Sequence, residues 1–248
     1  PYLLAVRKAA GPACYTVILM DPRSGASSAA LIWVPAHDRL RGANVITTVT
    51  GPNAFSPERI EHLRAAMPND VAALPSPRVA VLLGGRNSAF KYTDADIARL
   101  TASLVALAAS GAGLMISPSR RTHPELLAAV DMATADAQRL IWRGEGANPY
   151  ADFLANADAL IVTADSVNMT GEACATGRPV YVFRPAGNAG KLERFHAALA
   201  AHGVTRLLPE PPFDLEQWTY PSLNATATIA HEIEQRWQRR ATMLPGMV

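Results

Sequence analysis

The chain has 248 residues, of which 49% are hydrophobic and 18% charged, a composition typical of a soluble globular protein with one large or two small domains. Its formal net charge is +2, and its 23 Lys and Arg residues are scattered rather than gathered into a basic stripe, so the sequence does not indicate a nucleic-acid partner. Serine and glycine residues interrupt the most apolar stretch, residues 100–116, which excludes a membrane-spanning helix there.

The first predicted element is an amphipathic helix over Tyr2–Ala10, and an apolar strand follows it. Such a helix normally comes after a strand of its own, so we expect a fragment that lacks the front of its first domain. Short apolar runs predict strands over Tyr15–Met20, Ala30–Val34, Asn44–Thr48, Val79–Leu83, Gly113–Ser117, Arg139–Trp142, Ala159–Thr163 and Pro179–Phe183. Several of these runs are continuous rather than alternating, which is typical of strands covered on both faces.

Longer helical patterns separate the later strands. Thr93-Asp-Ala-Asp96 and Thr122-His-Pro-Glu125 both resemble a capping box ahead of an amphipathic helix. In the second of these starts, a proline in the first turn is tolerated because its missing N–H has no partner there. Two further helices are predicted, over Lys191–His202 and Ala225–Arg240.

The alternation of strands and helices predicts an α/β fold with right-handed crossovers and doubly wound parallel sheets. The stretch from Pro68 to Pro77 is rich in proline and has little periodicity, which favours a domain boundary there. We therefore expect a truncated N-terminal α/β domain over residues 1–70 and a complete Rossmann-like domain over residues 71–248. The C-terminal helix is assigned to the second domain, although it could also pack back towards the first.

Ligands of open parallel sheets bind outside the carboxyl ends of the strands, and three unusual segments follow predicted strands here. The first is Gly84-Gly85-Arg86-Asn87-Ser88. Glycines allow a ligand to approach the backbone closely, and free N–H groups after them suit phosphate oxygens. A tight turn at the strand exit, capped by Asn87 and Ser88, explains the same residues equally well.

The second segment contains Arg120 and Arg121, just before a predicted helix. Adjacent cations at a helix N-terminus oppose the helix dipole unless an anion is present, and a diphosphate would supply one. An arginine could then bind a phosphate through two hydrogen bonds. Two solvated surface arginines are the alternative.

The third segment, from Asp158 to Phe183, carries the strongest pattern. A buried strand ends at Thr163, a short capped helix follows, and Gly177 ends that helix. N–H groups at the helix start suit phosphate, and a carboxylate on the helix can accept two hydrogen bonds from a ribose diol. The candidate binding residues are Asp165, Ser166, Met169, Thr170, Gly171 and Glu172. The alternative is a capped connector in which Glu172 forms a salt bridge.

The order Asp-Ser-x-x-Met-x-x-Glu-Ala-x-Ala-Thr-Gly-x-Pro-Val-Tyr over residues 165–181 resembles the mitochondrial fission protein family of bacteria and plants. Further segments agree with that family: Leu19–Arg23, Val34–Asn44, the Gly84-Gly85 turn and Ser119–Thr122. The family in turn resembles GT-B glycosyltransferases, so the resemblance implies two Rossmann-like domains, with the acceptor bound by the first. It also implies that Glu172 holds the donor ribose, with structural roles for Gly177 and Pro179.

Bacterial members of this family are often labelled nucleoside-diphosphate-sugar epimerases. That chemistry would need a GxGxxG motif and a Tyr-x-x-x-Lys pair, and these residues contain neither. We expect instead a nucleotide-sugar-binding protein, and a glycosyltransferase that uses a nucleoside diphosphate sugar without a metal or another cofactor. The acceptor, nucleobase and sugar do not follow from the sequence.

In the first domain, His37 and Asp38 follow the strand predicted over Ala30–Val34. A histidine at a strand end could act as a general base on an acceptor hydroxyl, because its ordinary pKa suits that role. A surface-loop histidine is the simpler explanation. Asp21-Pro-Arg23 follows the preceding strand, and a turn is again the simpler interpretation.

The rival hypothesis is a non-catalytic scaffold or a membrane-associated interaction protein, as the family name implies. Arg236, Arg239 and Arg240 gather at the end of the last helix, which also fits ordinary complementarity to the helix dipole. Cys14 and Cys174 are far apart in apolar surroundings, which favours free thiols in a reducing compartment. We expect a cytoplasmic protein, peripheral to the inner membrane if it contacts a membrane; the oligomeric state stays open.

Overall fold

The structure, a computed structural model, describes residues 2–11, 14–187 and 190–243. It divides into two compact units, which we call unit 1 (Pro1–Ala54 with Asn224–Val248) and unit 2 (Phe55–Leu223). The helices are α1 (Tyr2–Ala10), η2 (Ala26–Ser28), α2 (Pro57–Ala65), α3 (Asn69–Ala72), α4 (Asp94–Ala109), α5 (Pro124–Ala133), α6 (Tyr150–Asn156), α7 (Val167–Cys174), α8 (Lys191–Ala201) and α9 (Ala225–Met243). The strands are β1 (Val17–Leu19), β2 (Leu31–Pro35), β3 (Val45–Thr48), β4 (Arg78–Leu83), β5 (Gly113–Pro118), β6 (Arg139–Ile141), β7 (Ala159–Thr163), β8 (Val180–Phe183) and β9 (Thr205–Leu207).

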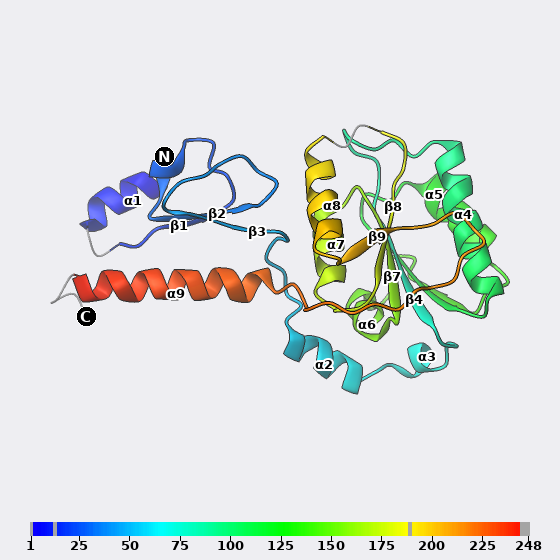
Figure 1. Cartoon of the computed structure of the whole chain (residues 1–248). Helices are drawn as coiled ribbons and strands as arrows, with labels where there is room; N and C mark the ends of the chain where they lie inside the picture. The colour runs from blue at the N-terminus through cyan, green and yellow to red at the C-terminus, as the bar shows by residue number, and fades with distance from the viewer. Residues whose placement is uncertain (1, 12–13, 188–189, 244–248) are drawn as a thin grey trace. The chain divides into compact units, whose positions relative to one another are not determined.

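Unit 1 is built on a three-stranded parallel sheet in the order β1-β2-β3. Successive residues of β2 point to opposite faces of this sheet, so its two faces bury different partners. Trp33 packs with Ala225 and Ile229 of α9, whereas Ile32 lies in a separate cluster that includes Leu3 of α1. Figure 1 shows the long red helix α9 running along the blue strands.

The boundary between the units differs from the one expected near residue 70. It lies between Ala54 and Phe55, and α9 belongs to unit 1 because its apolar side is buried against Trp33. The segment that follows Ala54 is attached to unit 2 instead. Arg64 of α2 donates hydrogen bonds to the carbonyls of Ala155 and Thr176, at 2.8 and 3.1 Å.

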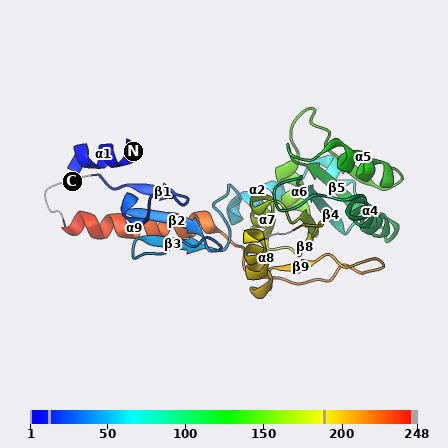
Figure 2. The ribbon, with the colours of Figure 1, turned by 90° about the horizontal axis from the view of Figure 1, so that it is seen from above.

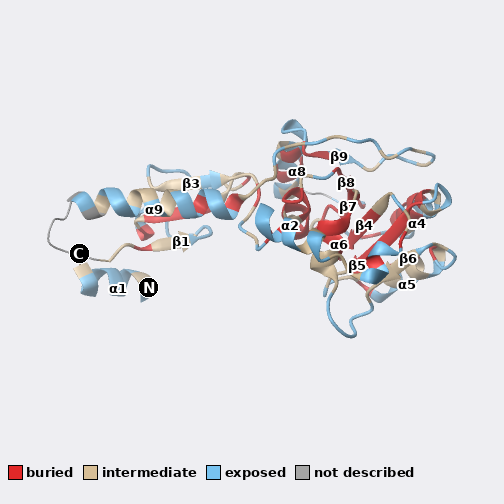
Figure 3. Ribbon diagram, turned by 90° about the horizontal axis from the view of Figure 1, so that it is seen from below, coloured by how far each residue is buried: buried red, intermediate tan, exposed pale blue. Residues whose placement is uncertain are grey.

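Unit 2 contains a six-stranded parallel sheet in the order β6-β5-β4-β7-β8-β9. Numbered within this sheet by chain order, that is the doubly wound Rossmann order 3-2-1-4-5-6. Helices α4 and α5 cover one face, and α6, α7 and α8 cover the other (Figure 1 and Figure 2). Val79–Leu83 and Ala159–Thr163 are buried throughout, as Figure 3 shows in red. The predicted α/β fold with parallel sheets is confirmed.

Local sequence signals explain most of these elements. Thr93 caps α4: its side chain accepts a hydrogen bond from the Asp96 amide, and the Asp96 carboxylate accepts one from the Thr93 amide in return. All eight predicted strands are present, whereas β9 and the short helices α2, α3 and α6 were not predicted. Across the described residues, no helix is long and apolar enough to cross a membrane.

Candidate functional site

The strand order of unit 2 reverses between β4 and β7, and the carboxyl ends of these two strands are the expected place for a ligand. Asp165, two residues beyond β7, joins them. Its fully buried carboxylate accepts hydrogen bonds from the Gly85 amide at 2.8 Å, the Tyr92 hydroxyl at 2.6 Å and the Thr163 hydroxyl at 2.8 Å. Arg121 approaches the same carboxylate at 3.4 Å. We call this cluster the Asp165 hub (Gly85, Tyr92, Arg121, Thr163 and Asp165).

The hub explains the two glycines after β4. A Cβ atom on Gly84 would lie 2.2 Å from a carboxylate oxygen of Asp165, and one on Gly85 would lie 1.8 Å from the backbone oxygen of Arg121. The amides of the two glycines themselves are engaged within the chain. The Gly84 amide donates to the Thr163 hydroxyl at 2.7 Å, and the Gly85 amide donates to Asp165. The two glycines therefore allow the Asp165 side chain and the Arg121 backbone to pack closely against them.

The residues after the glycines divide between a turn and the surface. Asn87 closes the turn: its side-chain oxygen accepts hydrogen bonds from the Ala89 and Phe90 amides at 2.8 and 2.9 Å. Its side-chain nitrogen donates to the Asp165 carbonyl at 3.1 Å, so the structure supports the turn alternative for Asn87. Arg86 and Ser88 are exposed. Of this segment, their side chains have the better access to a ligand.

The second segment also differs from the predicted capping box. The N-cap of α5 is His123, and its side chain makes no capping hydrogen bond. The Thr122 hydroxyl instead donates to the Leu83 and Gly84 carbonyls, each at 2.7 Å, and accepts a hydrogen bond from the Ser119 amide at 2.8 Å. The hydroxyl shares the Leu83 carbonyl, the last of β4, with the Ser119 amide, and it supplies a donor to the Gly84 carbonyl that follows.

The two arginines of this segment have different positions. Arg121 pairs with the buried Asp165, although half of its own side chain remains exposed. Arg120 is exposed. The positive charge of Arg121 opposes the dipole of α5, and the Asp165 carboxylate partly compensates for it. Arg120, the preceding residue, adds a second positive charge before the start of α5.

Two residues that the sequence did not single out complete this region. Tyr92 donates to Asp165, and the ring of His123 packs edge-on against the Tyr92 ring with centroids 5.3 Å apart. Burial raises the pKa of Tyr92, and the charge of Asp165 adds to this. Burial lowers the pKa of His123, and the charge of Arg86 acts in the same direction. Among the described residues, neither ring nitrogen of His123 has a hydrogen-bond partner.

The predicted helix after β7 is present as α7, and Ser166 is its N-cap, accepting a hydrogen bond from the Met169 amide at 3.4 Å. Thr170 is fully buried and its hydroxyl donates to the Ser166 carbonyl at 2.9 Å. Met169 and Gly171 are buried as well, and Asn168 is the exposed residue of the first turn. The inner face of α7 therefore serves packing, and its outer face is available to solvent.

Glu172 is the partly buried carboxylate of α7. Its Oε2 atom accepts a hydrogen bond of 2.5 Å from the hydroxyl of Tyr150, the first residue of α6. Burial raises the pKa of Glu172, and this hydrogen bond lowers it in part. Among the described residues, Glu172 makes no salt bridge, which was the alternative interpretation, and accepts a bond from a neutral donor. Tyr150 carried no recognisable signal in the sequence.

In unit 1, His37 and Asp38 lie in a turn after β2. The His37 Nε2 atom is 3.9 Å from a carboxylate oxygen of Asp38, and the side chain of Arg41 donates hydrogen bonds to three backbone carbonyls of this turn. His37 is only 8% exposed, so the simpler explanation of a surface histidine is wrong. At the end of β1, the Asp21 side chain accepts a hydrogen bond from the Arg23 amide at 2.8 Å, which is the predicted turn.

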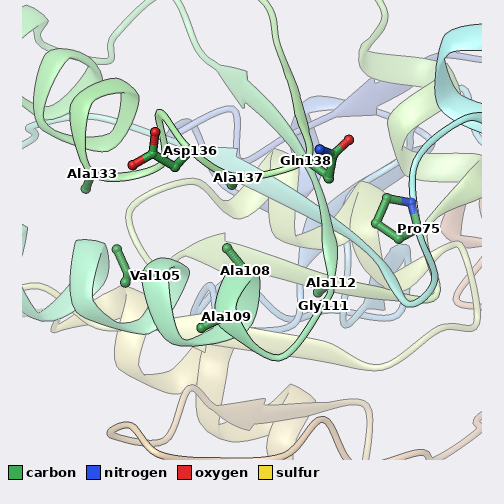
Figure 4. Close-up of a pocket in the computed structure, with 10 residues that line it drawn as sticks. All are labelled: Pro75, Val105, Ala108, Ala109, Gly111, Ala112, Ala133, Asp136, Ala137 and Gln138. Atoms are coloured by element: carbon green, nitrogen blue, oxygen red, sulfur yellow. The ribbon is translucent and has the colours of Figure 1, made fainter.

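A separate hollow of about 510 Å³ lies at the opposite end of the sheet, where β4, β5 and β6 begin (Figure 4). Its walls are mainly alanine, valine and proline, with Asp136 and Gln138 as the polar side chains. Among the described residues that line it, none is cationic, so it does not suit a phosphate. Within the described part of the chain, no group of His, Cys, Asp and Glu side chains could hold a metal ion.

Comparison with known proteins agrees with the order of residues after β7. A family model described as Mitochondrial fission ELM1 matches residues 1–237. The chain belongs to this family. It is 34% identical to the Mitochondrial fission protein ELM1 of Arabidopsis thaliana over 203 residues, which cover 81% of this chain and 47% of that protein. The uncharacterized protein RP120 of Rickettsia prowazekii is 35% identical over 162 residues, or 62% of this chain and 45% of its own length.

The chain thus spans about half the length of the curated ELM1-family relatives that it matches. Among solved structures, it is similar to a putative UDP-N-acetylglucosamine 2-epimerase from Listeria monocytogenes, with a TM-score of 0.47, 11% identity, and coverage of 88% of this chain and 54% of that one. It is also similar to WaaG, a glycosyltransferase of lipopolysaccharide biosynthesis, with a TM-score of 0.41, 14% identity, and coverage of 85% and 57%. Because both TM-scores lie below 0.5, we infer nothing about chemistry from them.

Proposed function

We propose that unit 2 binds a nucleoside diphosphate sugar at the carboxyl ends of β4, β5 and β7, with Glu172 accepting hydrogen bonds from the ribose. The position of Glu172 carries this proposal. It is a partly buried carboxylate on the helix that follows β7, beside the point where the Rossmann strand order reverses. A carboxylate with an acceptor position left over suits the two vicinal hydroxyls of a ribose.

For the diphosphate, the engaged amides of Gly84 and Gly85 leave arginine side chains as the main partners. Arg86 and Arg120 are exposed on the two loops after β4 and β5, and Arg121 lies beside them. Guanidinium groups bind phosphate oxygens through paired, charge-assisted hydrogen bonds. The exposed first turn of α7, at Asn168, adds the positive end of a helix dipole.

Glycosyl transfer is the reaction that this binding would serve. The bond between the sugar carbon and the diphosphate oxygen breaks, a bond to an acceptor oxygen forms, and the acceptor proton passes to a base. Arginines and helix dipoles in place before the reaction would stabilise the charge that develops on the leaving diphosphate. The proposed base is His37, with Asp38 beside it.

Calorimetric titration of the full-length protein with UDP, ADP and GDP tests the binding step. We expect one of these nucleotides to bind, and Glu172→Ala to weaken its affinity at least about tenfold, because hydrogen bonds to a charged acceptor are strong. Glu61→Ala, at an exposed glutamate of α2, is the matched control and should bind like the wild type.

If no nucleoside diphosphate binds, the proposal is wrong. The rival scaffold hypothesis makes a different prediction, since binding to a protein partner or to vesicles would survive the double change Glu172→Ala and Arg120→Ala. If Glu172→Ala binds the nucleotide as tightly as the wild type, the ribose is bound by residues other than Glu172.

A further inference from the structure

The hydrogen bond between Tyr150 and Glu172 has a consequence for the proposed ribose site. Tyr150 begins α6 and Glu172 lies on α7, so the bond joins the helix that precedes β7 to the helix that follows it. At 2.5 Å it is short, as expected for a hydroxyl that donates to a carboxylate. It occupies Oε2 of the carboxylate, and Tyr150 is the one donor to Glu172 that the structure records among the described residues.

We infer that Tyr150 is a positioning residue for nucleotide binding: its hydroxyl orients the Glu172 carboxylate as the acceptor for the ribose. This inference rests on the proposed function. With Oε2 shared with Tyr150, Oε1 remains for one ribose hydroxyl and the second acceptor position of Oε2 for the other. The tyrosine thus acts through Glu172 rather than on the sugar.

The position of the Tyr150 hydroxyl is set before any ligand arrives. The Tyr150 ring packs edge-on against Phe55 with centroids 6.2 Å apart, and the guanidinium of Arg59 lies 5.1 Å above the Phe55 ring. The Tyr150 amide donates to the Asn148 side chain at 3.0 Å, which fixes the start of α6. Ring packing and backbone anchoring therefore hold the donor in one place, and a preorganised donor costs little on binding.

The charges around Glu172 favour this role. Burial raises the pKa of Glu172, and the bond from Tyr150 opposes that rise. Burial also raises the pKa of Tyr150, with the Glu172 charge adding to it, so the hydroxyl keeps its proton throughout the neutral range. Tyr150 is the titratable group that faces Glu172 from α6; on α7 itself the other titratable residue is the buried Cys174, and Arg59 of α2 lies over Phe55.

Replacing the tyrosine by phenylalanine removes the hydroxyl and keeps the ring. In Tyr150→Phe, burial acts on Glu172 without the opposing hydrogen bond, so its pKa should rise further. A protonated Glu172 carries one donor and loses acceptor capacity. Nucleotide affinity should therefore fall at a higher pH in this variant than in the wild type.

Two measurements on the full-length protein test the inference. Carbon-13 NMR of the side-chain carboxyl follows the titration of Glu172 without ligand, in the wild type and in Tyr150→Phe. Calorimetry then follows the affinity for UDP-glucose against pH, because the diphosphate diester of this ligand has no proton that titrates near neutral pH. We expect a higher Glu172 pKa in the variant and about tenfold weaker binding at neutral pH. The pH at which affinity for UDP-glucose is lost on acidification should be higher in the variant than in the wild type.

Tyr220→Phe is the matched control, since it also removes a tyrosine hydroxyl hydrogen bond, from Tyr220 to the Arg178 carbonyl at 2.7 Å, without touching Glu172. It should leave both measurements unchanged, and Glu172→Gln should remove the pH dependence of binding. An unchanged Glu172 titration in Tyr150→Phe overturns the inference. If the titration shifts and no UDP-sugar or other nucleotide binds the wild type, the proposed function fails and the control of Glu172 by Tyr150 stands.

Discussion

Removal of the Asp165 carboxylate is the most direct perturbation of the unit 2 site. In Asp165→Ala, the Gly85 amide and the Tyr92 hydroxyl lose their acceptor, and both groups lie in buried residues. An unsatisfied buried donor costs about 1–3 kcal/mol, and the cavity left by the missing carboxylate adds to this cost. We therefore expect the free energy of unfolding to fall by about 3–5 kcal/mol. That is a large part of the roughly 5–15 kcal/mol by which a domain is stable.

Asp165→Asn should be milder, for a geometric reason. Its remaining oxygen can face the Gly85 amide, which cannot turn away, while its new amide group faces the Tyr92 and Thr163 hydroxyls, which can rotate and accept. The loss of charge assistance and of the pairing with Arg121 still costs about 1–3 kcal/mol. The order of stability is therefore wild type, then asparagine, then alanine.

Urea unfolding followed by circular dichroism measures these differences, and hydrogen exchange of peptides from β4 and β7 locates them. Asp214→Ala, at an exposed aspartate of unit 2, is the control and should change little. A loss below about 1 kcal/mol in Asp165→Ala, or unchanged exchange at the two strand ends, would refute the hub as a structural centre.

Three further predictions follow from the same geometry. Gly85→Ala should destabilise unit 2 by about 3 kcal/mol in urea unfolding, because its Cβ would meet the Arg121 backbone at 1.8 Å, whereas Gly51→Ala makes an ordinary 3.7 Å contact and should be neutral. Thr122→Val should cost about 1–2 kcal/mol in the same assay, and Thr122→Ser should recover most of it, since its hydroxyl and not its methyl holds the end of β4. Burial lowers the pKa of His196, whose Nε2 lies 2.8 Å from a backbone carbonyl. In the unfolded state His196 regains its ordinary pKa of about 6.5, so below this pH the unfolded state binds more protons than the folded state. The free energy of unfolding should therefore fall as the pH is lowered through about 6.5, and it should fall less in His196→Gln.

The sheet of unit 2 was predictable because its inner strands are buried on both faces. Val79–Leu83 and Ala159–Thr163 consist almost wholly of apolar residues, and such runs cannot be loops in water. The edge strand β9 was missed because its three residues, Thr205–Leu207, include an exposed arginine and form no apolar run. The last helix was assigned to the second domain, whereas α9 packs in unit 1, because an amphipathic helix fits any apolar face and the sequence does not say which one.

The candidate site was predictable only in part, and the reason is the distance along the chain between its partners. Tyr92 lies 73 residues from Asp165, and no local pattern joins them. Two glycines after a strand have the same appearance whether they admit a phosphate or a carboxylate of the protein itself, and only the tertiary arrangement decides. Thr122 fits the capping-box pattern, but the nearer carbonyls of β4 take its hydroxyl.

The two acidic residues of the motif after β7 illustrate how the same chemistry serves two purposes. Asp165 is fully buried, and its hydrogen bonds use both oxygens to hold strand ends and loops together. Glu172, seven residues later, is partly buried and has one described donor, Tyr150, on one of its oxygens. A saturated carboxylate is a structural anchor, whereas one with acceptor positions left can exchange water for ligand hydroxyls. The motif therefore combines an anchor with the binding group that we propose, and the ligand hypothesis depends on Glu172 and not on Asp165.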